Sequence, residues 1–252
     1  MLSIIYENES MFAVDKPAGM IVNNADTAKD VQTLQDLVEA SGKLAHTRPQ
    51  ETEKYMVGGY NKFDEFLSRS GIVHRLDKET SGIILVAKNA DTFMELQRQF
   101  KSSEVKKTYN ALVHGRIEQQ EGEIDAPVSR LPWNRMRFGV NPGGREAKTL
   151  YKVLDYKQLP SGEGATYVEV YPQTGRTHQI RVHFQHIHHP IFADELYAGR
   201  KTGRDDRKVL SRHFLHASRI SFLNPGNGQR MELESPLPPE LSNLLSSLPS
   251  GN

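Results

Sequence analysis

A carboxylate among basic side chains is the group in this sequence best suited to do chemistry. Asp77 lies in a short polar loop that leads directly into the apolar residues 83–87. The same loop carries His74, Arg75 and Lys78. The continuous, β-branched run after it is typical of a strand that is buried on both faces. Because a rigid strand often positions a catalytic group in the loop beside it, the pattern makes this loop a candidate site for such a group.

Five parts of the chain, in order, resemble the RluA-type pseudouridine synthases. One of them is His-Arg-Leu-Asp at residues 74–77, followed by Thr-Ser-Gly at residues 80–82. The others are VDKPAG from Val14, KTYNALVHG from Lys107, TGRTHQIRVH from Thr174, and FLHA with SPLP near the C-terminus. One such match would be weak, whereas five in the same order over nearly the whole chain are specific.

The resemblance implies an enzyme that isomerises uridine to pseudouridine at a specific position in structured RNA, ribosomal or transfer, without a cofactor or metal. It implies the catalytic residues Asp77, Tyr109 and Arg181. Asp77 would either attack the sugar C1′ or remove the C2′ proton, and the sequence does not choose between these routes. Arg181 would favour the ionised form of Asp77. Tyr109 would stack on the target uracil and assist removal of the C5 proton, and we favour stacking because the pKa of a tyrosine is about 10.

Cations near these motifs are expected to bind RNA. We assign this role to His74, Arg75, Lys78, Arg176 and His178. Arg75 either fills the space left by a base taken out of the stack or contacts a phosphate. The basic residues within 199–208 would extend the same phosphate-binding surface. For any one of these clusters alone, a solvated surface is the simpler interpretation.

Composition limits the classes of protein that the chain can belong to. Its 252 residues are 37% hydrophobic, with a net charge of +1 and no cysteine. Disulfides and thiolate catalysis are therefore excluded, and a reducing compartment is compatible. We find no membrane-length apolar run and no secretory signal. We expect a cytoplasmic monomer that needs no protein partner and binds RNA through local clusters of charge.

The elements that must position these residues follow a pattern in which strands outnumber helices. This favours an α+β fold with a central mixed, largely antiparallel sheet, flanked by helices around one cleft. We expect one catalytic domain over residues 1–252, without a separate N-terminal RNA-binding module. Helices are predicted at 33–41, from 89 to 100 and at 177–189. A strand or a hairpin is predicted at 2–14, further strands at 83–87, 107–113, 147–156 and 165–171, and mostly loop at 122–144. Residues 42–70 are interpreted as an extended, mobile surface insertion, which is either a candidate for target recognition or a surface loop without a role in function.

Two other functions and one other kind of site remain open at this stage. An RNA hydrolase would need a second acid or base beside Asp77, and no spaced pair stands out. A non-catalytic RNA-binding relative would be expected to lack one of the catalytic residues, and none is missing. The histidines at 183, 186, 188 and 189 could suggest zinc, but no cysteine or acidic ligand accompanies them, so structural or RNA-facing roles are preferred. Asn23 and Asn24 stand where many members of the family carry a histidine.

Overall fold

The computed structural model describes residues 2–24, 31–45, 55–57 and 60–251. The chain forms two compact units, of which the first comprises Met1–Val105 with Ile220–Ser235 and the second Lys106–Arg219 with Pro236–Asn252. Strand β12 (Leu215–Leu223) carries the chain from the second unit into the first. None of the described helices is long and apolar enough to cross a membrane.

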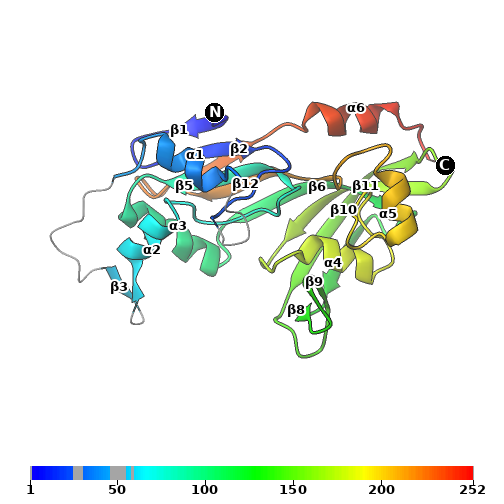
Figure 1. Cartoon of the computed structure of the whole chain (residues 1–252), viewed down its shortest axis with the longest axis horizontal. Helices are drawn as coiled ribbons and strands as arrows, with labels where there is room; N and C mark the ends of the chain where they lie inside the picture. Colours follow the sequence, from blue (N-terminus) through cyan, green and yellow to red (C-terminus); the bar gives the residue numbers. More distant parts are fainter. Residues whose placement is uncertain (1, 25–30, 46–54, 58–59, 252) are drawn as a thin grey trace. The chain divides into compact units, whose positions relative to one another are not determined.

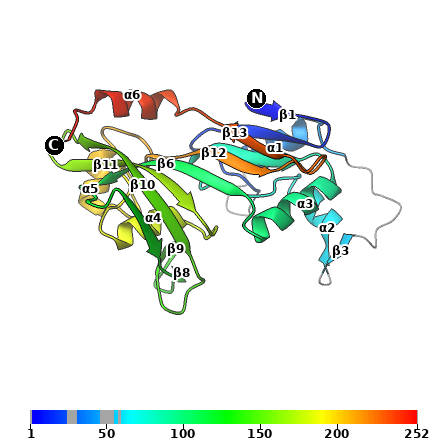
Figure 2. The same cartoon turned by 180° about the vertical axis from the view of Figure 1, so that it is seen from behind.

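The first unit is built on the strand order β1-β2-β5-β12, with β13 beside β12 (Figure 2). Its strands are β1 (Ile4–Glu7), β2 (Met11–Lys16), β5 (Ser81–Ala87) and β13 (Arg230–Glu234). β5 is buried along its whole length and pairs antiparallel with β2. The prediction of a strand buried on both faces is confirmed, because side chains alternate between the two faces of a sheet and all residues of β5 are buried.

Three helices complete the first unit. They are α1 (Leu34–Ala40), α2 (Lys62–Ser68) and α3 (Ala90–Lys101), and α3 packs on β5 while α2 packs on α3 (Figure 1). The side chains of Thr33 and Asn89 cap α1 and α3, so both predicted helices are confirmed.

The expectation of an extended insertion at residues 42–70 is wrong for its last part. Within this range the structure describes a short hairpin of β3 (Met56–Val57) and β4 (Tyr60–Asn61), followed by α2. Phe63 and Phe66 of α2 are buried, and Phe66 meets Phe93 of α3 edge-on. The remainder, residues 46–54 and 58–59, lies outside the described residues.

The second unit contains the strand order β6-β11-β10-β7. These strands are β6 (Lys106–His114), β11 (Gly164–Pro172), β10 (Lys148–Gln158) and β7 (Glu121–Asp125). All three pairings are antiparallel, as are those of the first unit whose register is known. The α+β class with a largely antiparallel sheet is therefore confirmed.

Residues 122–144 were predicted to be mostly loop, and this prediction is wrong. They include most of β7 and a separate hairpin of β8 (Val128–Leu131) and β9 (Asn134–Val140), which lies beside α4 (Gln179–His186) (Figure 1). The prolines that suggested a loop stand between these strands or after them. α4 is shorter than the predicted helix at 177–189, and α5 (Arg200–Asp206) and α6 (Pro239–Ser247) complete the unit.

Candidate active site

The loop that carries Asp77 is held at its first residue by close packing of backbone against backbone. Gly71 has φ +71°, and a Cβ there would lie 2.1 Å from the carbonyl oxygen of Ala87 in β5. The Ala87 N–H donates to the Gly71 carbonyl at 2.9 Å. Only glycine fits this approach, so the chain enters the loop from a fixed point on the buried strand.

Asp77 itself is half-buried and opens a tight turn, in which the Thr80 N–H donates to the Asp77 carbonyl at 3.1 Å. The next carbonyl, that of Lys78, accepts the Gly19 N–H at 2.8 Å and the Lys16 ammonium at 3.1 Å. Asp77 is thus displayed by a turn that residues 16–19 hold at the Lys78 carbonyl.

Lys16 is the buried centre of this support. Its side chain is 0% exposed, and its Nζ also donates to the carbonyls of Pro17 and Met20 at 2.9 and 3.0 Å. A buried ammonium is tolerated only when its donors are satisfied. Sequence reasoning noticed the segment from Val14 to Gly19 but missed this role, because the partner Lys78 is 62 positions away.

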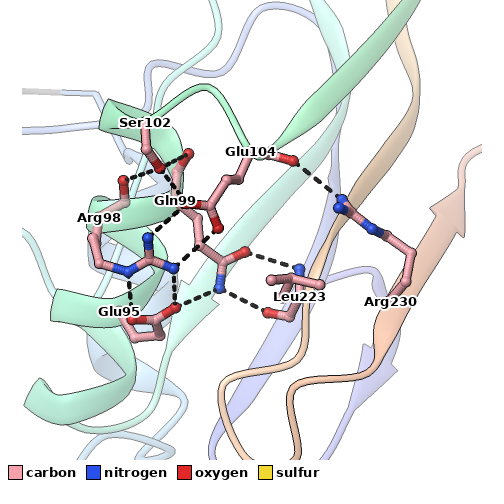
Figure 3. Close-up of polar contacts among 7 residues, drawn as sticks. All are labelled: Glu95, Arg98, Gln99, Ser102, Glu104, Leu223 and Arg230. Carbon is pink, nitrogen blue, oxygen red and sulfur yellow. Dashed lines mark hydrogen bonds and ion pairs between the residues drawn. The ribbon is translucent and has the colours of Figure 1, made fainter.

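His74 contributes to the same support. Its Nε2 accepts the Leu85 N–H of β5 at 3.0 Å, and its ring lies 4.7 Å from that of Phe100 in α3. The end of α3 is fastened in turn, because the buried Gln99 exchanges hydrogen bonds of 2.8 and 2.9 Å with the backbone of Leu223 (Figure 3). In the same network Arg98 binds Glu95 and Glu104, and Arg230 donates to the Glu104 carbonyl (Figure 3). Arg75 and Lys78 are exposed, and RNA contact by all three loop residues stays a prediction.

The other predicted site residues lie in the second unit. Tyr109 is on β6, where it pairs with Val170 of β11 and packs against the core of this unit. Lys107, two positions earlier on the same strand, donates its ammonium to the Thr174 carbonyl at 3.3 Å. Burial, together with the nearby Arg176 and Lys106, lowers the pKa of Lys107 to about 8. Two cations therefore meet at the Thr174–Arg176 turn, a favourable place for an anion.

Arg176 is half-buried and donates from Nε to the carbonyl of Glu146 at 2.9 Å. Burial lowers the pKa of its guanidinium, and the neighbouring Arg145 adds to the effect. The next residue but one, His178, adopts φ +57° just before α4, and its Nδ1 lies 2.8 Å from the Tyr197 hydroxyl.

Arg181 is buried in α4 and makes a two-point ion pair with a carboxylate that sequence reasoning missed. Its Nε and Nη2 donate to Asp194 at 2.7 and 2.9 Å, and Asp194 is 0% exposed. Nothing in the local sequence marks Asp194, although a buried arginine calls for a carboxylate somewhere in the fold. The predicted pairing of Arg181 with Asp77 stays a prediction.

His183 is one of the four histidines that could suggest a metal site in the sequence. His183 is 0% exposed, its Nδ1 lies 2.9 Å from the Thr149 hydroxyl, and its Nε2 lies 2.9 Å from the Ala126 carbonyl. These contacts make it a structural residue. Among the residues that the structure describes, no group of three or more metal-ligating side chains is found.

Comparisons with known proteins agree with the fold and with the motifs. The family model described as RNA pseudouridylate synthase matches residues 10–186. A ribosomal large subunit pseudouridine synthase D of Neisseria meningitidis serogroup B is 37% identical over 98% of this chain and 61% of its own length. An uncharacterised RNA pseudouridine synthase of Aquifex aeolicus is 38% identical over 93% of this chain and 70% of its own. The human RNA pseudouridylate synthase domain containing 1 has a TM-score of 0.71 and 25% identity, covering 97% and 87% of the two chains.

The chain therefore belongs to the RNA pseudouridine synthases. Within them, the similarity to the synthase D proteins supports the RluA type. As such it is an isomerase that converts uridine to pseudouridine in RNA.

Proposed function

We propose that this chain, as one catalytic domain over residues 1–252, isomerises a specific uridine of structured ribosomal or transfer RNA in the cytoplasm. Asp77 is the acting carboxylate and no cofactor takes part. The observation that carries the proposal is the support of the Asp77 turn, in which the buried Lys16 ammonium binds three backbone carbonyls. A turn held this firmly presents a half-buried carboxylate with little freedom, as catalysis by positioning requires.

The reaction needs only bond exchange within one nucleotide. The N1–C1′ bond breaks, the uracil turns, and a C5–C1′ bond forms as the C5 proton leaves and N1 gains a proton. Asp77 starts this sequence by attack on C1′ or by removal of the C2′ proton, and must be ionised in either case. Arg181 is proposed to favour that ionised form, and Tyr109 to stack on the uracil.

RNA binding is proposed to draw on cations of both units acting on phosphates. Arg75 and Lys78 are exposed beside Asp77, and Arg176 and His178 flank the start of α4. The turn of the β8–β9 hairpin adds an apolar surface, since Trp133 and Met136 are 79% and 72% exposed. Aromatic side chains in such positions can stack on unpaired bases.

The decisive experiment replaces Asp77 by Asn. RNA from cells that lack this protein, labelled with tritium at uracil C5, reports the reaction because the tritium is released when C5 bonds to the sugar. Asp77→Asn should release no tritium and keep the melting temperature of the wild type. Glu79→Gln, in the same turn, is the matched control and should stay active. Robust tritium release by the Asp77→Asn protein would sink the proposal.

The substrate is identified by a separate measurement. Pseudouridines are mapped across all RNAs of cells with and without this protein. The proposal expects one or a few positions in ribosomal or transfer RNA to lose pseudouridine, and the absence of any difference would contradict it.

A further inference from the structure

The Asp194 carboxylate is held in one orientation by its own hydrogen bonds, and it therefore fixes the orientation of Arg181. Besides the two bonds from Arg181, the Asp194 carboxylate accepts the backbone N–H groups of Leu196 and Tyr197 at 3.0 and 3.2 Å. A carboxylate that accepts four donors in a fully buried position has no alternative rotamer to adopt. The arginine that it binds through Nε and Nη2 is fixed in the plane of that pair.

Tyr197 limits the remaining freedom of the guanidinium. The Cζ of Arg181 lies 4.9 Å from the centre of the Tyr197 ring, which is itself 4% exposed. The Tyr197 hydroxyl accepts the backbone N–H of Phe138 at 3.0 Å and lies 2.8 Å from Nδ1 of His178. The ring is therefore held at its hydroxyl end by two contacts, and it covers one face of the guanidinium.

The chemistry of arginine leaves room for a second task. A guanidinium carries five N–H groups in a planar fork, and the ion pair with Asp194 is made by Nε and Nη2, so one arginine has the donors to bind more than one carboxylate. A fully buried ion pair is a poor means of stabilising a fold, because well-packed apolar residues usually do as well. Fixing the geometry of a functional group is what such a pair does better than apolar packing.

We propose that Asp194 and Tyr197 are positioning residues for the isomerisation, which hold the Arg181 guanidinium in the orientation in which it serves Asp77. This inference rests on the proposed function, since it assumes that Arg181 acts on Asp77. It assigns to the segment after α4 a part in catalysis, although neither residue needs to touch the RNA.

The test is a double-mutant cycle between positions 194 and 181. Single-turnover rates at saturating tritium-labelled RNA are measured for Asp194→Asn, Arg181→Lys and the double variant, together with RNA affinity and melting temperature. Asp194→Asn should slow the rate at least about tenfold with little change in RNA affinity. In the Arg181→Lys background the same change should cost almost nothing, because its effect passes through the arginine.

A conservative variant keeps the test valid if Asp194→Asn does not fold. Asp194→Glu retains the charge but moves the carboxylate by one methylene, so it should slow the rate less than Asp194→Asn while RNA affinity stays unchanged. Tyr197→Phe keeps the ring over Arg181 and should stay within a few-fold of the wild-type rate, whereas Tyr197→Leu should lose as much as Asp194→Glu.

Arg212 and Glu240 offer a control in which a buried arginine binds a carboxylate that is 48% exposed. Arg212 is as buried as Arg181 and binds Glu240 through Nε and Nη2 at 3.2 and 3.0 Å. Glu240→Gln should lower stability without slowing the saturated rate. The inference is overturned if Asp194→Asn and Asp194→Glu react at the wild-type rate, or if the effects at 194 and 181 add fully. Failure of the proposed function looks different, because Asp77→Asn would then still release tritium.

Discussion

The Nζ of Lys16 lies 3.1 Å from the backbone carbonyl of Lys78, the residue that follows Asp77. This contact joins the end of β2 to the turn that displays the carboxylate. Because Lys16 is 0% exposed and its ammonium also binds Pro17 and Met20, the hydrogen bonds are exchanged without competition from water.

Lys16→Met should damage both the fold and the reaction. The apolar side chain fits the length of the lysine but removes the ammonium from three carbonyls, of which that of Lys78 keeps the Gly19 N–H, and this loss should lower the free energy of unfolding by about 2–4 kcal/mol. The saturated rate should fall by about tenfold or more, because the Asp77 turn loses its support. Denaturant unfolding and single-turnover kinetics measure the two effects.

Lys43→Met serves as the control for Lys16→Met. Lys43 pairs with Glu7 on the surface, with 31% of its side chain exposed, and its loss should change stability by at most about 1 kcal/mol. Equal effects of the two substitutions would show that Lys16 has no special role.

RNA affinity should fall as the pH rises past the pKa of Lys107. Burial lowers that pKa to about 8 in the free protein, with Arg176 and Lys106 adding to the effect. A phosphate bound at this ammonium favours its protonated form, so binding takes up a proton above that pH. The affinity should therefore decline by up to about tenfold per pH unit between about pH 8 and pH 10.

Two variants of Lys107 separate this effect from general changes with pH. Lys107→Arg stays protonated and should keep its affinity constant over the same range. Lys107→Gln should bind weakly at every pH. Lys106→Gln, at the exposed neighbour on β6, should retain the slope of the wild type. A wild-type affinity that does not change above about pH 8 would rule out phosphate binding at Lys107.

The elements that the sequence predicted correctly are those that carry local signals. β5 was recognised because its residues are apolar throughout, and α1 and α3 because Thr33 and Asn89 are strong caps. β7 was missed because its stability comes from pairing with β10, as Lys148 opposite Asp125 shows, and no local pattern reports such a partner. Pro127 and Pro132 mark the breaks between strands. In the sequence alone, such prolines look the same as those of a continuous loop.

The residues of the candidate site also differ in whether a local signal marks them. Asp77 could be found because a motif surrounds it. The supports provided by Lys16 and Asp194 could not, because each is defined by a partner that only the fold brings near. A buried lysine or a fully satisfied carboxylate has the same letter in the sequence as one on the surface.

His183 should make the protein lose stability in mild acid. Burial lowers the pKa of its imidazole below the ordinary value of 6.5, and the nearby His186 adds to this effect, while the hydrogen bond to the Ala126 carbonyl opposes it. The unfolded chain therefore takes up a proton at a pH where the folded protein resists it. The stabilising contribution is complete above pH 6.5 and is lost as the pH falls below it.

His183→Gln tests this assignment. The variant should be less stable at neutral pH, yet its free energy of unfolding should depend less on pH between about 6.5 and 5 than that of the wild type. His188→Gln, at an exposed position just after α4, should leave the dependence unchanged. Parallel curves for wild type and His183→Gln in urea unfolding at several pH values would refute the role of His183.

The exposed cations of α5 should set part of the salt dependence of RNA binding. Arg200, Lys201 and Arg204 are all exposed, and the helix that carries them is anchored from inside. The buried Asp206 accepts the Ala193 N–H at 3.0 Å and lies 2.8 Å from Nε2 of His114. Replacing the three cations by Gln should therefore leave the fold intact.

The measurement is RNA affinity as a function of salt concentration. Each phosphate neutralised adds about 0.7–0.9 to the slope of log affinity against log salt, so the triple variant should lower the slope by up to about 2–3. A second triple variant serves as the control and changes the net charge by the same amount. It combines Lys43→Gln, Arg98→Gln and Lys152→Gln, at three cations that form ion pairs with carboxylates elsewhere on the protein. It should keep the slope of the wild type. If both triple variants flatten the slope equally, net charge rather than contact by α5 governs binding, and α5 is not part of the RNA-binding surface.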